Sequence, residues 1–237
     1  GLILCTAKNG VEVGTEKSWK RVQDRALPRM FYISKLDEEH ADFVGTAAAL
    51  REAFGSSVCP IILPIMDGGK LTGYVDIPKN KAYSFAYAEC PVPAALADQV
   101  EEYRMELTEA VAETSDELME KFFAEEPFTE EEYVTGIKAG VAAGTLAPVM
   151  GGCYLTGFGT LPLIDAIISY VPSPLEAKAE HGEDGNGDAV EVQPDPNGPT
   201  CAFVFKTVTD QYGRFSFFKV VSGKVTSDMT LVNARTG

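Results

Sequence analysis

The most informative stretch of this chain is Met30-Phe31-Tyr32-Ile33-Ser34-Lys35-Leu36-Asp37. It begins with a continuous apolar run, which is typical of a parallel strand buried on both faces of a sheet. Another run of this kind, Leu2-Ile3-Leu4-Cys5, lies upstream, and helices are expected after the two runs, over residues 12–25 and 42–54. This alternation of strand and helix predicts an α/β domain built on a parallel sheet.

The Lys-x-Asp sequence after the strand predicts a loop that reads guanine. We expect the Asp37 carboxylate to accept hydrogen bonds from the ring N–H and the exocyclic amine of the base. The aliphatic stem of Lys35 is expected to pack along the ring. Adenine does not offer this pair of donors and would leave a buried carboxylate unpaired. The loop therefore favours guanine over adenine.

The sequence contains no phosphate loop of the form G-x-x-x-x-G-K-[ST]. We expect the chain to begin after the point at which such a loop would lie. The chain then carries the base-reading half of a nucleotide site without the half that handles phosphate and magnesium. By itself it is expected to be enzymatically inactive and to carry no bound nucleotide or metal.

Composition limits the classes of function. The chain has 237 residues, 45% of them hydrophobic and 23% charged, which is typical of one large or two smaller globular domains. A net charge of −15 disfavours direct binding to DNA, RNA or an anionic membrane, and it suits either a basic protein partner or solubility alone. Five widely spaced cysteines without a C-x-x-C motif predict reduced, mostly buried thiols in a cytoplasmic protein.

The middle of the chain has a different pattern. Strands are expected over residues 58–66, 71–76 and 81–86, followed by a helix with apolar residues at helical spacing from Leu96 to Val111. Thr114-x-x-Glu117 and Thr129-x-x-Glu132 predict capping boxes that open two more helices. Residues 146–150 then return to the parallel sheet, before the loop Gly151-Gly152-Cys153-Tyr154 and a helix over 160–171. The middle section is therefore predicted to be an insertion in one α/β domain.

The last third of the chain predicts a linker and the beginning of a second domain. Residues 174–199 are acidic and rich in Gly and Pro, and strands are expected over 201–208, 215–221 and 230–232. Three strands are too few for a closed barrel, so this domain is expected to be cut short. We expect Trp19 and the cluster of Phe215, Phe217 and Phe218 to be core residues.

These motifs, in this order, resemble elongation factor G, the translocase of the translational GTPases, over essentially the whole chain. The guanine motif Ser34-Lys35-Leu36-Asp37 matches the Asn-Lys-x-Asp of that family. The remaining matches are residues 10–20, Leu27-Pro28-Arg29, residues 148–154, Gly159, residues 162–165, residues 172–175, and residues 205–214 with Ser222-Gly223.

The resemblance implies a division of the chain. Residues 1–57 would be the base-binding half of a P-loop-GTPase-type G domain, 58–146 an α+β insert, and 147–174 the end of the G domain. Residues 175–199 would be the acidic linker, and 200–237 the truncated start of the all-β barrel domain II. The whole parent protein would hydrolyse GTP, with magnesium, to drive translocation on the ribosome.

The resemblance also implies a guanine-binding set, which comprises Ser34, Lys35, Asp37, Cys153 and Tyr154. Ser34 replaces the asparagine of the family and supplies one donor instead of two. Tyr154 replaces a small residue, usually alanine, whose backbone N–H faces the guanine carbonyl. Both changes suggest a divergent paralogue with a relaxed or weakened base site.

A partner surface is implied as well. The helix around residues 96–111 is rich in glutamate, and the resemblance places such an insert against the lysine-bearing C-terminal domain of the ribosomal stalk protein. Glu102, Glu106 and Glu109 are the expected contacts, with little pairing inside the chain. A merely solvated acidic face is the alternative. Two further alternatives are a ribosome- or stalk-docking module that needs no nucleotide, and a relative of the tetracycline-resistance ribosomal protection proteins.

Overall fold

The computed structural model describes residues 1–176, 179–184, 187–234 and 236–237, and these form two compact units. The first unit comprises Gly1–Val171 and the second Pro172–Gly237. The first unit combines a parallel sheet with helices, so the predicted α/β class is confirmed. None of the helices in the described ranges is long and apolar enough to cross a membrane.

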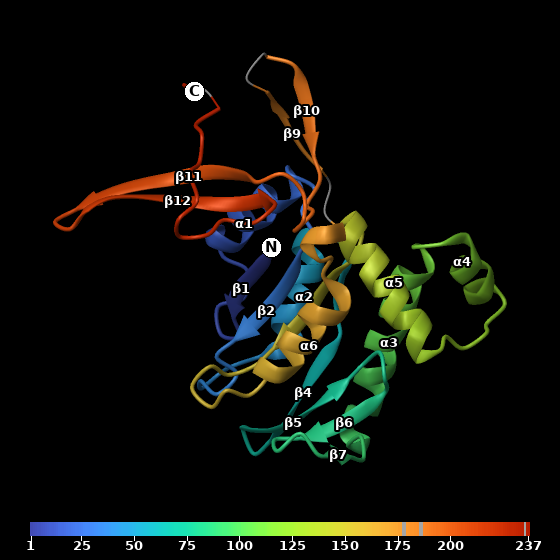
Figure 1. Cartoon of the computed structure of the whole chain (residues 1–237). Coiled ribbons are helices and arrows are strands. Elements are labelled where there is room, and N and C mark those ends of the chain that lie inside the picture. The colour runs from blue at the N-terminus through green and yellow to red at the C-terminus, as the bar shows by residue number, and fades with distance from the viewer. Residues whose placement is uncertain (177–178, 185–186, 235) are drawn as a thin grey trace. The chain divides into compact units, whose positions relative to one another are not determined.

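The parallel sheet has the strand order β1-β2-β8-β3 (Figure 1). Its strands are β1 (Leu2–Thr6), β2 (Met30–Ser34), β8 (Ala147–Gly151) and β3 (Val58–Pro60). The apolar run of β2 is buried on both faces, as predicted. The expectation that β1 is buried on both faces is wrong, because Leu2 is 40% and Leu4 61% exposed. β1 is an edge strand of the sheet, and the described residues cover only the face that carries Ile3 and Cys5.

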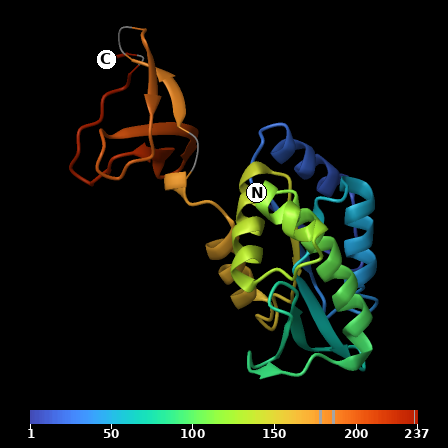
Figure 2. The same ribbon diagram turned by 90° about the vertical axis from the view of Figure 1, so that its right-hand side faces the viewer.

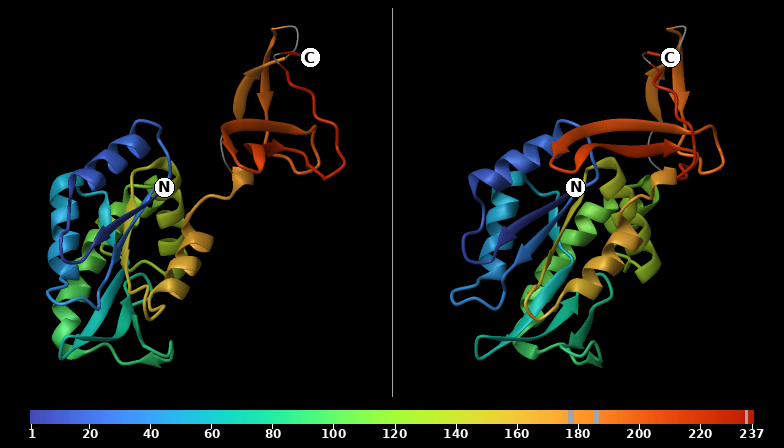
Figure 3. Two further views of the ribbon diagram at one scale, coloured as in Figure 1. Left: turned by 90° about the vertical axis from the view of Figure 1, so that its left-hand side faces the viewer. Right: turned by 60° about the vertical axis from the view of Figure 1, so that its left-hand side comes forward.

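Helices cover the two faces of this sheet. α1 (Val13–Gln23) and α2 (Phe43–Phe54) lie on one face and α6 (Thr160–Tyr170) lies on the other, as Figure 2 and Figure 3 show. Trp19 of α1 stacks on Phe31 of β2 and on Phe54 of α2, with ring centroids 5.4 and 4.9 Å apart. Trp19 is therefore a core residue, as predicted.

The middle section contains a second sheet, which is antiparallel, and three α-helices. The elements are β4 (Ile62–Asp67), β5 (Lys70–Asp76), β6 (Lys81–Ser84), β7 (Glu89–Cys90), the 3-10 helix η1 (Ala94–Leu96), α3 (Ala97–Ala112), α4 (Asp116–Phe123) and α5 (Glu130–Ala143). The single strand expected over residues 58–66 is two strands. The chain pairs with β8 up to Pro60 and then enters the antiparallel sheet at Ile62, so it crosses from one sheet to the other at Ile61.

One of the two predicted capping boxes is present in the structure. Thr129 and Glu132 form both arms of a capping box at the start of α5. The box expected at Thr114 is wrong, because the hydroxyl of Ser115 caps α4 by accepting a hydrogen bond from the Leu118 N–H. The Thr114 hydroxyl instead donates to the Val111 carbonyl at the end of α3.

The second unit contains two hairpins. The elements are the 3-10 helix η2 (Pro174–Glu176), β9 (Glu180–Glu183), β10 (Ala189–Val192), β11 (Cys201–Asp210) and β12 (Gly213–Ser222). The composition of the expected linker did not predict the β9–β10 pair. No strand forms over the described residues 230–232, contrary to expectation. Phe215, Phe217 and Phe218 are 42–49% exposed and not core residues, because no second layer covers the two-stranded β11–β12 hairpin in the described part of the chain.

Candidate functional site

The loops that follow β2 and β8 lie side by side. Both strands are parallel, and Ile33 pairs with Gly151 at their carboxyl ends. The Gly152 N–H donates to the Ile33 carbonyl over 3.0 Å, and the Leu36 N–H reaches the Gly152 carbonyl over 3.4 Å. Two segments that are distant in the sequence therefore form one site at the carboxyl edge of the sheet, which is where α/β folds bind ligands.

Glycine allows this close approach. A Cβ atom at Gly152 would collide with the Tyr32 hydroxyl and the Phe158 carbonyl, and one at Gly151 would lie 2.8 Å from the Phe43 ring. Gly159 adopts a φ of +85°, which a residue with a side chain rarely adopts. These three glycines close the second loop onto the first.

The Lys-x-Asp loop turns its charged side chains outward. Lys35 has a φ of +63°, and Leu36 points into the core with 2% of its surface exposed. Lys35 and Asp37, on either side of Leu36, are half-buried and exposed, respectively. The Lys35 ammonium donates to Glu38 Oε1 over 2.8 Å, and this interaction raises the Lys35 pKa, with smaller contributions from Tyr154 and Asp37.

Lys35 and Asp37 lie on the first of the two joined loops, and Tyr154 lies on the second, two residues after Gly152. The site therefore presents a lysine stem, a solvent-accessible carboxylate and an aromatic ring that is 69% exposed. A planar base with a pair of N–H donors suits this combination. The lysine stem and the ring supply apolar surfaces, and the carboxylate supplies two acceptor oxygens.

Ser34 has a different environment from Lys35 and Asp37. Its hydroxyl donates to the Cys5 carbonyl over 3.0 Å and so joins the carboxyl ends of β1 and β2. The one donor of this side chain is therefore engaged by the protein backbone. In this structure Ser34 fixes the loop, and it presents no free donor to a base.

The two residues of the second loop also differ from each other. The Cys153 N–H donates to the Phe158 carbonyl over 2.9 Å, and the thiol is buried. Among the described residues no acceptor receives a hydrogen bond from the Tyr154 N–H. Of the two backbone N–H groups in the expected set, only that of Tyr154 is available to a guanine carbonyl.

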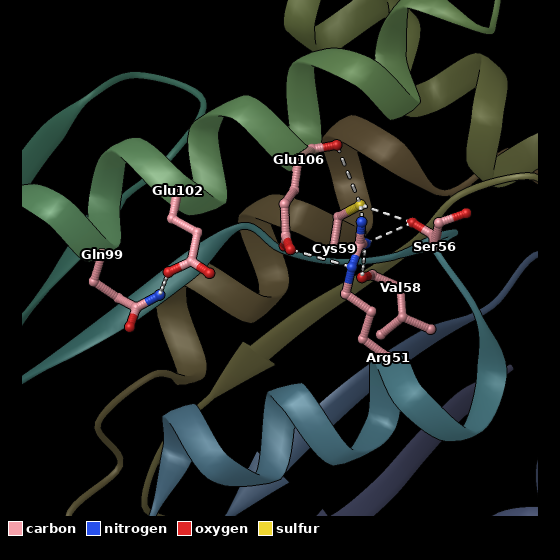
Figure 4. A network of polar contacts seen from close by, with 7 residues as sticks. All are labelled: Arg51, Ser56, Val58, Cys59, Gln99, Glu102 and Glu106. Atoms are coloured by element: carbon pink, nitrogen blue, oxygen red, sulfur yellow. Dashed lines mark hydrogen bonds and ion pairs between the residues drawn. The ribbon is translucent and has the colours of Figure 1, made fainter.

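The expected partner contacts lie on α3, away from these loops. Glu102 and Glu109 are exposed, as expected. Glu106 is not a free surface charge, because its Oε1 lies 3.2 Å from Nε of Arg51 on α2, and only 24% of its side chain is exposed (Figure 4). Arg51 also donates to the Ser56 and Val58 carbonyls, so the guanidinium is fixed between α2 and β3 (Figure 4).

Sequence reasoning did not identify Glu38, Phe158 or Arg51 as parts of these two sites. Glu38 had a local signal, since an acidic residue three positions after Lys35 is well placed to pair with it. Arg51 had none, because Glu106 lies on another helix. Phe158 had none either, because it contributes its backbone carbonyl, which its residue type does not indicate. No group of three or more potential metal ligands occurs within the described ranges.

Comparisons with known proteins agree with this geometry. Residues 1–173 match the family model of the elongation factor Tu GTP binding domain. A crystal structure of the protein ttk003000868 from Thermus thermophilus superposes with a TM-score of 0.75 and 32% sequence identity. That match covers 93% of this chain and 31% of the Thermus chain, so this chain spans about a third of that protein's length.

The parallel sheet, the two joined loops and the family match together define the class as a GTP-binding domain of a translation factor. The chain belongs to the elongation factor Tu GTP-binding domain family, and thus to the translational GTPases. Members of this family use guanine nucleotides, which is the ligand that the Lys-x-Asp loop predicts.

Proposed function

We propose that this chain carries the base-reading part of the guanine-nucleotide site in an elongation-factor-G-like translational GTPase. The observation that carries this proposal is the hydrogen-bonded junction of the loops after β2 and β8, of which the first carries Lys35 and Asp37 and the second carries Tyr154. In the whole protein, GTP hydrolysis with magnesium would drive translocation on the ribosome in the cytoplasm.

The proposed recognition has three parts. The Asp37 carboxylate accepts from the ring N–H and the exocyclic amine of guanine, which are the donors that adenine lacks. The Tyr154 N–H donates to the guanine carbonyl. The stem of Lys35, held by Glu38, packs along the ring. Phosphate binding and attack of water on the γ-phosphate need a phosphate loop and magnesium, and the sequence contains no motif for that loop.

The test is made in the whole parent protein and replaces one carboxylate oxygen of Asp37 with an amide nitrogen. Asp37→Asn replaces an acceptor oxygen with an amide donor, so it disfavours the exocyclic amine of guanine and favours the carbonyl that xanthine carries at the same position. We expect the ratio of GDP to XDP affinity to fall at least about fivefold, since an unpaired buried polar group costs about 1–3 kcal/mol. Glu39→Gln, an exposed change nearby, is the control. An unchanged ratio would remove Asp37 from the base site.

The isolated chain is proposed to bind GDP and magnesium too weakly for saturation in the low micromolar range, and to have no GTPase activity. Phosphate contacts and magnesium provide most of the affinity of such sites. Calorimetric titration of the chain with GDP and magnesium checks this. A saturable micromolar site with a preference for guanine would contradict it.

A second candidate is a docking module that no longer needs nucleotide. Two observations favour it: the Ser34 hydroxyl is engaged by the Cys5 carbonyl, and the second loop carries a large exposed ring at Tyr154. Ribosome pelleting with the whole protein distinguishes the two candidates. Binding that is equal with GTP, with GDP and without nucleotide favours the docking module, whereas dependence on GTP favours the GTPase.

The proposed partner of the acidic insert is the C-terminal domain of the ribosomal stalk protein. Exposed ion pairs contribute only ~0.2–1 kcal/mol each, so this affinity is modest and several carboxylates act together. The Debye length falls from ~10 Å at 0.1 M salt to ~3 Å at 1 M, so binding should weaken over that range. Titration of a labelled stalk domain at the two salt concentrations tests the partner, and binding that is insensitive to salt would count against it.

A further inference from the structure

A short antiparallel bridge between Cys153 and Phe158 closes the loop after β8. The Cys153 N–H donates to the Phe158 carbonyl over 2.9 Å, and inside the loop the Gly157 N–H donates to the Tyr154 carbonyl over 3.3 Å. The Tyr154 N–H, which the proposed function assigns to the guanine carbonyl, therefore lies inside a loop whose far end is Phe158. The position of this N–H depends on what holds Phe158.

Phe158 is held by aromatic rings from the middle section of the chain. Its side chain is buried, with 2% of its surface exposed. Phe85 and Tyr87 stack on it, with ring centroids 5.0 and 6.3 Å away and interplanar angles of 20° and 13°. Tyr74 of β5 meets it edge-on, with the ring centroids 6.0 Å apart. The anchor of the loop is thus a cluster of rings that belong to the antiparallel sheet and its turns.

A tight turn between β6 and β7 carries two of these rings. The Tyr87 N–H donates to the Ser84 carbonyl, and the Ser84 N–H donates to the Ala88 carbonyl, both over 2.8 Å. Tyr87 has a φ of +63°, a conformation that bulky residues rarely adopt. Such strained conformations persist only where the surrounding contacts hold them. The turn therefore keeps Phe85 and Tyr87 in place beside Phe158.

Phe85 lies at the rim of this cluster. Its N–H donates to the Thr72 carbonyl of β5 over 2.7 Å, so its backbone is fixed. Its side chain nevertheless remains 43% exposed, which a residue that only filled the core would not be. Phe85 contributes chiefly through its contact with Phe158, and it can be replaced without opening a cavity in the interior.

We propose that Phe158 is a positioning residue for guanine recognition and that Phe85 and Tyr87 of the middle section hold it. The two rings fix Phe158, its carbonyl fixes Cys153, and the peptide between Cys153 and Tyr154 then directs its N–H to the guanine carbonyl. None of the three phenyl rings touches the base. This inference rests on the proposed function for the ligand, and it makes the middle section a determinant of guanine affinity.

The first experiment needs no nucleotide and measures amide hydrogen exchange in the full chain by NMR. Phe85→Ala removes a ring stacked on Phe158, so it should speed exchange of the Cys153 N–H about twofold to tenfold, the range for the loss of one aromatic pair. The Gly152 N–H, which donates to the Ile33 carbonyl, is the internal reference and should exchange at an unchanged rate.

Two further variants are controls for the exchange experiment. Phe85→Tyr keeps the stacked ring and should exchange as the unsubstituted chain does. Phe123→Ala removes a ring that is 77% exposed on α4 of the same section, and it should also leave the Cys153 N–H unaffected. Urea unfolding checks that all three variants are folded. Equal exchange of the Cys153 N–H in Phe85→Ala and Phe123→Ala would overturn the anchoring of Phe158.

The second experiment measures nucleotide affinity in the whole parent protein near neutral pH. It compares GDP with 6-thio-GDP, which keeps the ring N–H and the exocyclic amine but presents sulfur, a weaker acceptor, in place of the carbonyl oxygen. The ratio of the two affinities therefore reports on the Tyr154 N–H and not on the Asp37 carboxylate. Phe85→Ala should lower this ratio about twofold or more, and Phe85→Tyr should restore it.

The outcomes separate this inference from the proposed function. If Phe85→Ala weakens GDP and 6-thio-GDP by the same factor, Phe85 acts on the stability of the protein and the positioning role is wrong. If the unsubstituted parent protein binds the two nucleotides equally, the proposed contact of Tyr154 with guanine is wrong, whatever the exchange rates show about the anchoring. If it prefers GDP and Phe85→Ala leaves the ratio unchanged, the proposed function stands and this inference fails.

Discussion

The Nη2 group of Arg29 donates a 2.7 Å hydrogen bond to the carbonyl oxygen of Gly144. Arg29 immediately precedes β2, and Gly144 ends α5 in a left-handed conformation with a φ of +76°. The guanidinium also lies 4.4 Å from the centre of the Trp19 ring. A cation at the C-terminus of a helix interacts favourably with the helix dipole. One side chain thus joins the end of the inserted section to the aromatic core at the amino end of β2.

Arg29→Ala is therefore expected to lower the free energy of unfolding by about 2–3 kcal/mol. The variant loses a hydrogen bond from a charged donor and a cation–π contact, and it leaves a carbonyl without its partner. Urea unfolding monitored by circular dichroism measures the change. Arg25→Ala, an exposed change just upstream, is the control and should have no effect. Equal midpoints for the two variants would mean that the contact does not stabilise the domain.

Charge reversal should distinguish Glu106 from its neighbours on α3. Glu106→Lys places two cations at the Arg51 site and should lower stability by about 1–3 kcal/mol, whereas Glu102→Lys should change it little. Glu106→Gln should be close to neutral, because burial and the charges of Glu102 and Glu109 oppose the attraction of Arg51. Urea unfolding of the three variants checks this order. If Glu102→Lys is as destabilising as Glu106→Lys, the Arg51–Glu106 ion pair does not distinguish Glu106 from its neighbours. Variants that test partner binding should therefore leave Glu106 unchanged.

The start of α5 should show a defined pH dependence. Glu132 accepts hydrogen bonds from Lys121 and from the Thr129 N–H, and these lower its pKa from 4.5 to about 2. Because the folded pKa is depressed, the stabilising contribution is fully present above pH 4.5 and is lost as the pH falls toward 2. Thermal unfolding of the parent chain and of Glu132→Gln should therefore differ at neutral pH and converge near pH 2. A difference that is constant with pH would exclude the ionised carboxylate as its cause.

The five cysteines are all free thiols, and labelling should separate them into a slowly reacting and a rapidly reacting group. Burial raises the pKa of Cys5 to about 11 and that of Cys59 to about 12, and Cys153 is buried as well. Because the thiolate is the reactive form, these three should react slowly at about pH 8. Cys90 and Cys201 are partly exposed and should be labelled first by an aromatic disulfide reagent. Mass spectrometry of the labelled native chain, with the urea-unfolded chain as control, checks the assignment.

The two departures at the base site should have unequal effects in the whole parent protein. Tyr154→Ala removes an exposed ring from the proposed base site and should change GDP affinity more than Ser34→Ala, because the Ser34 hydroxyl is engaged by the Cys5 carbonyl. Ser34→Ala should instead lower stability by about 0.5–1.5 kcal/mol through the lost hydrogen bond. Fluorescent GDP titration and urea unfolding separate the two effects. Negligible changes in GDP affinity for both variants would count against a base site at this position.

Most of the elements of the first unit follow from local patterns. The apolar run of β2, the helical spacing from Val100 to Val111 and the capping box at Thr129 all correspond to observed elements. Apart from the capping box at Thr114 and the β9–β10 pair, the errors lie where an element has no covering layer or changes sheet. β1 has an exposed face, residues 58–66 divide between two sheets, and the aromatic residues of β12 have no opposing layer among the described residues.

The sequence by itself determined the α/β class, the order of the elements and the Lys-x-Asp loop, because these depend on residues within a few positions of one another. Only the tertiary structure decided which groups meet. It engaged Ser34 with Cys5, Cys153 with Phe158 and Glu106 with Arg51, and it left the Tyr154 N–H without a partner among the described residues. The contacts of Ser34 with Cys5 and of Glu106 with Arg51 join different elements, so they depend on strand order and packing distance, which no local spacing in the chain encodes. The Cys153–Phe158 contact depends on how the loop after β8 closes on itself.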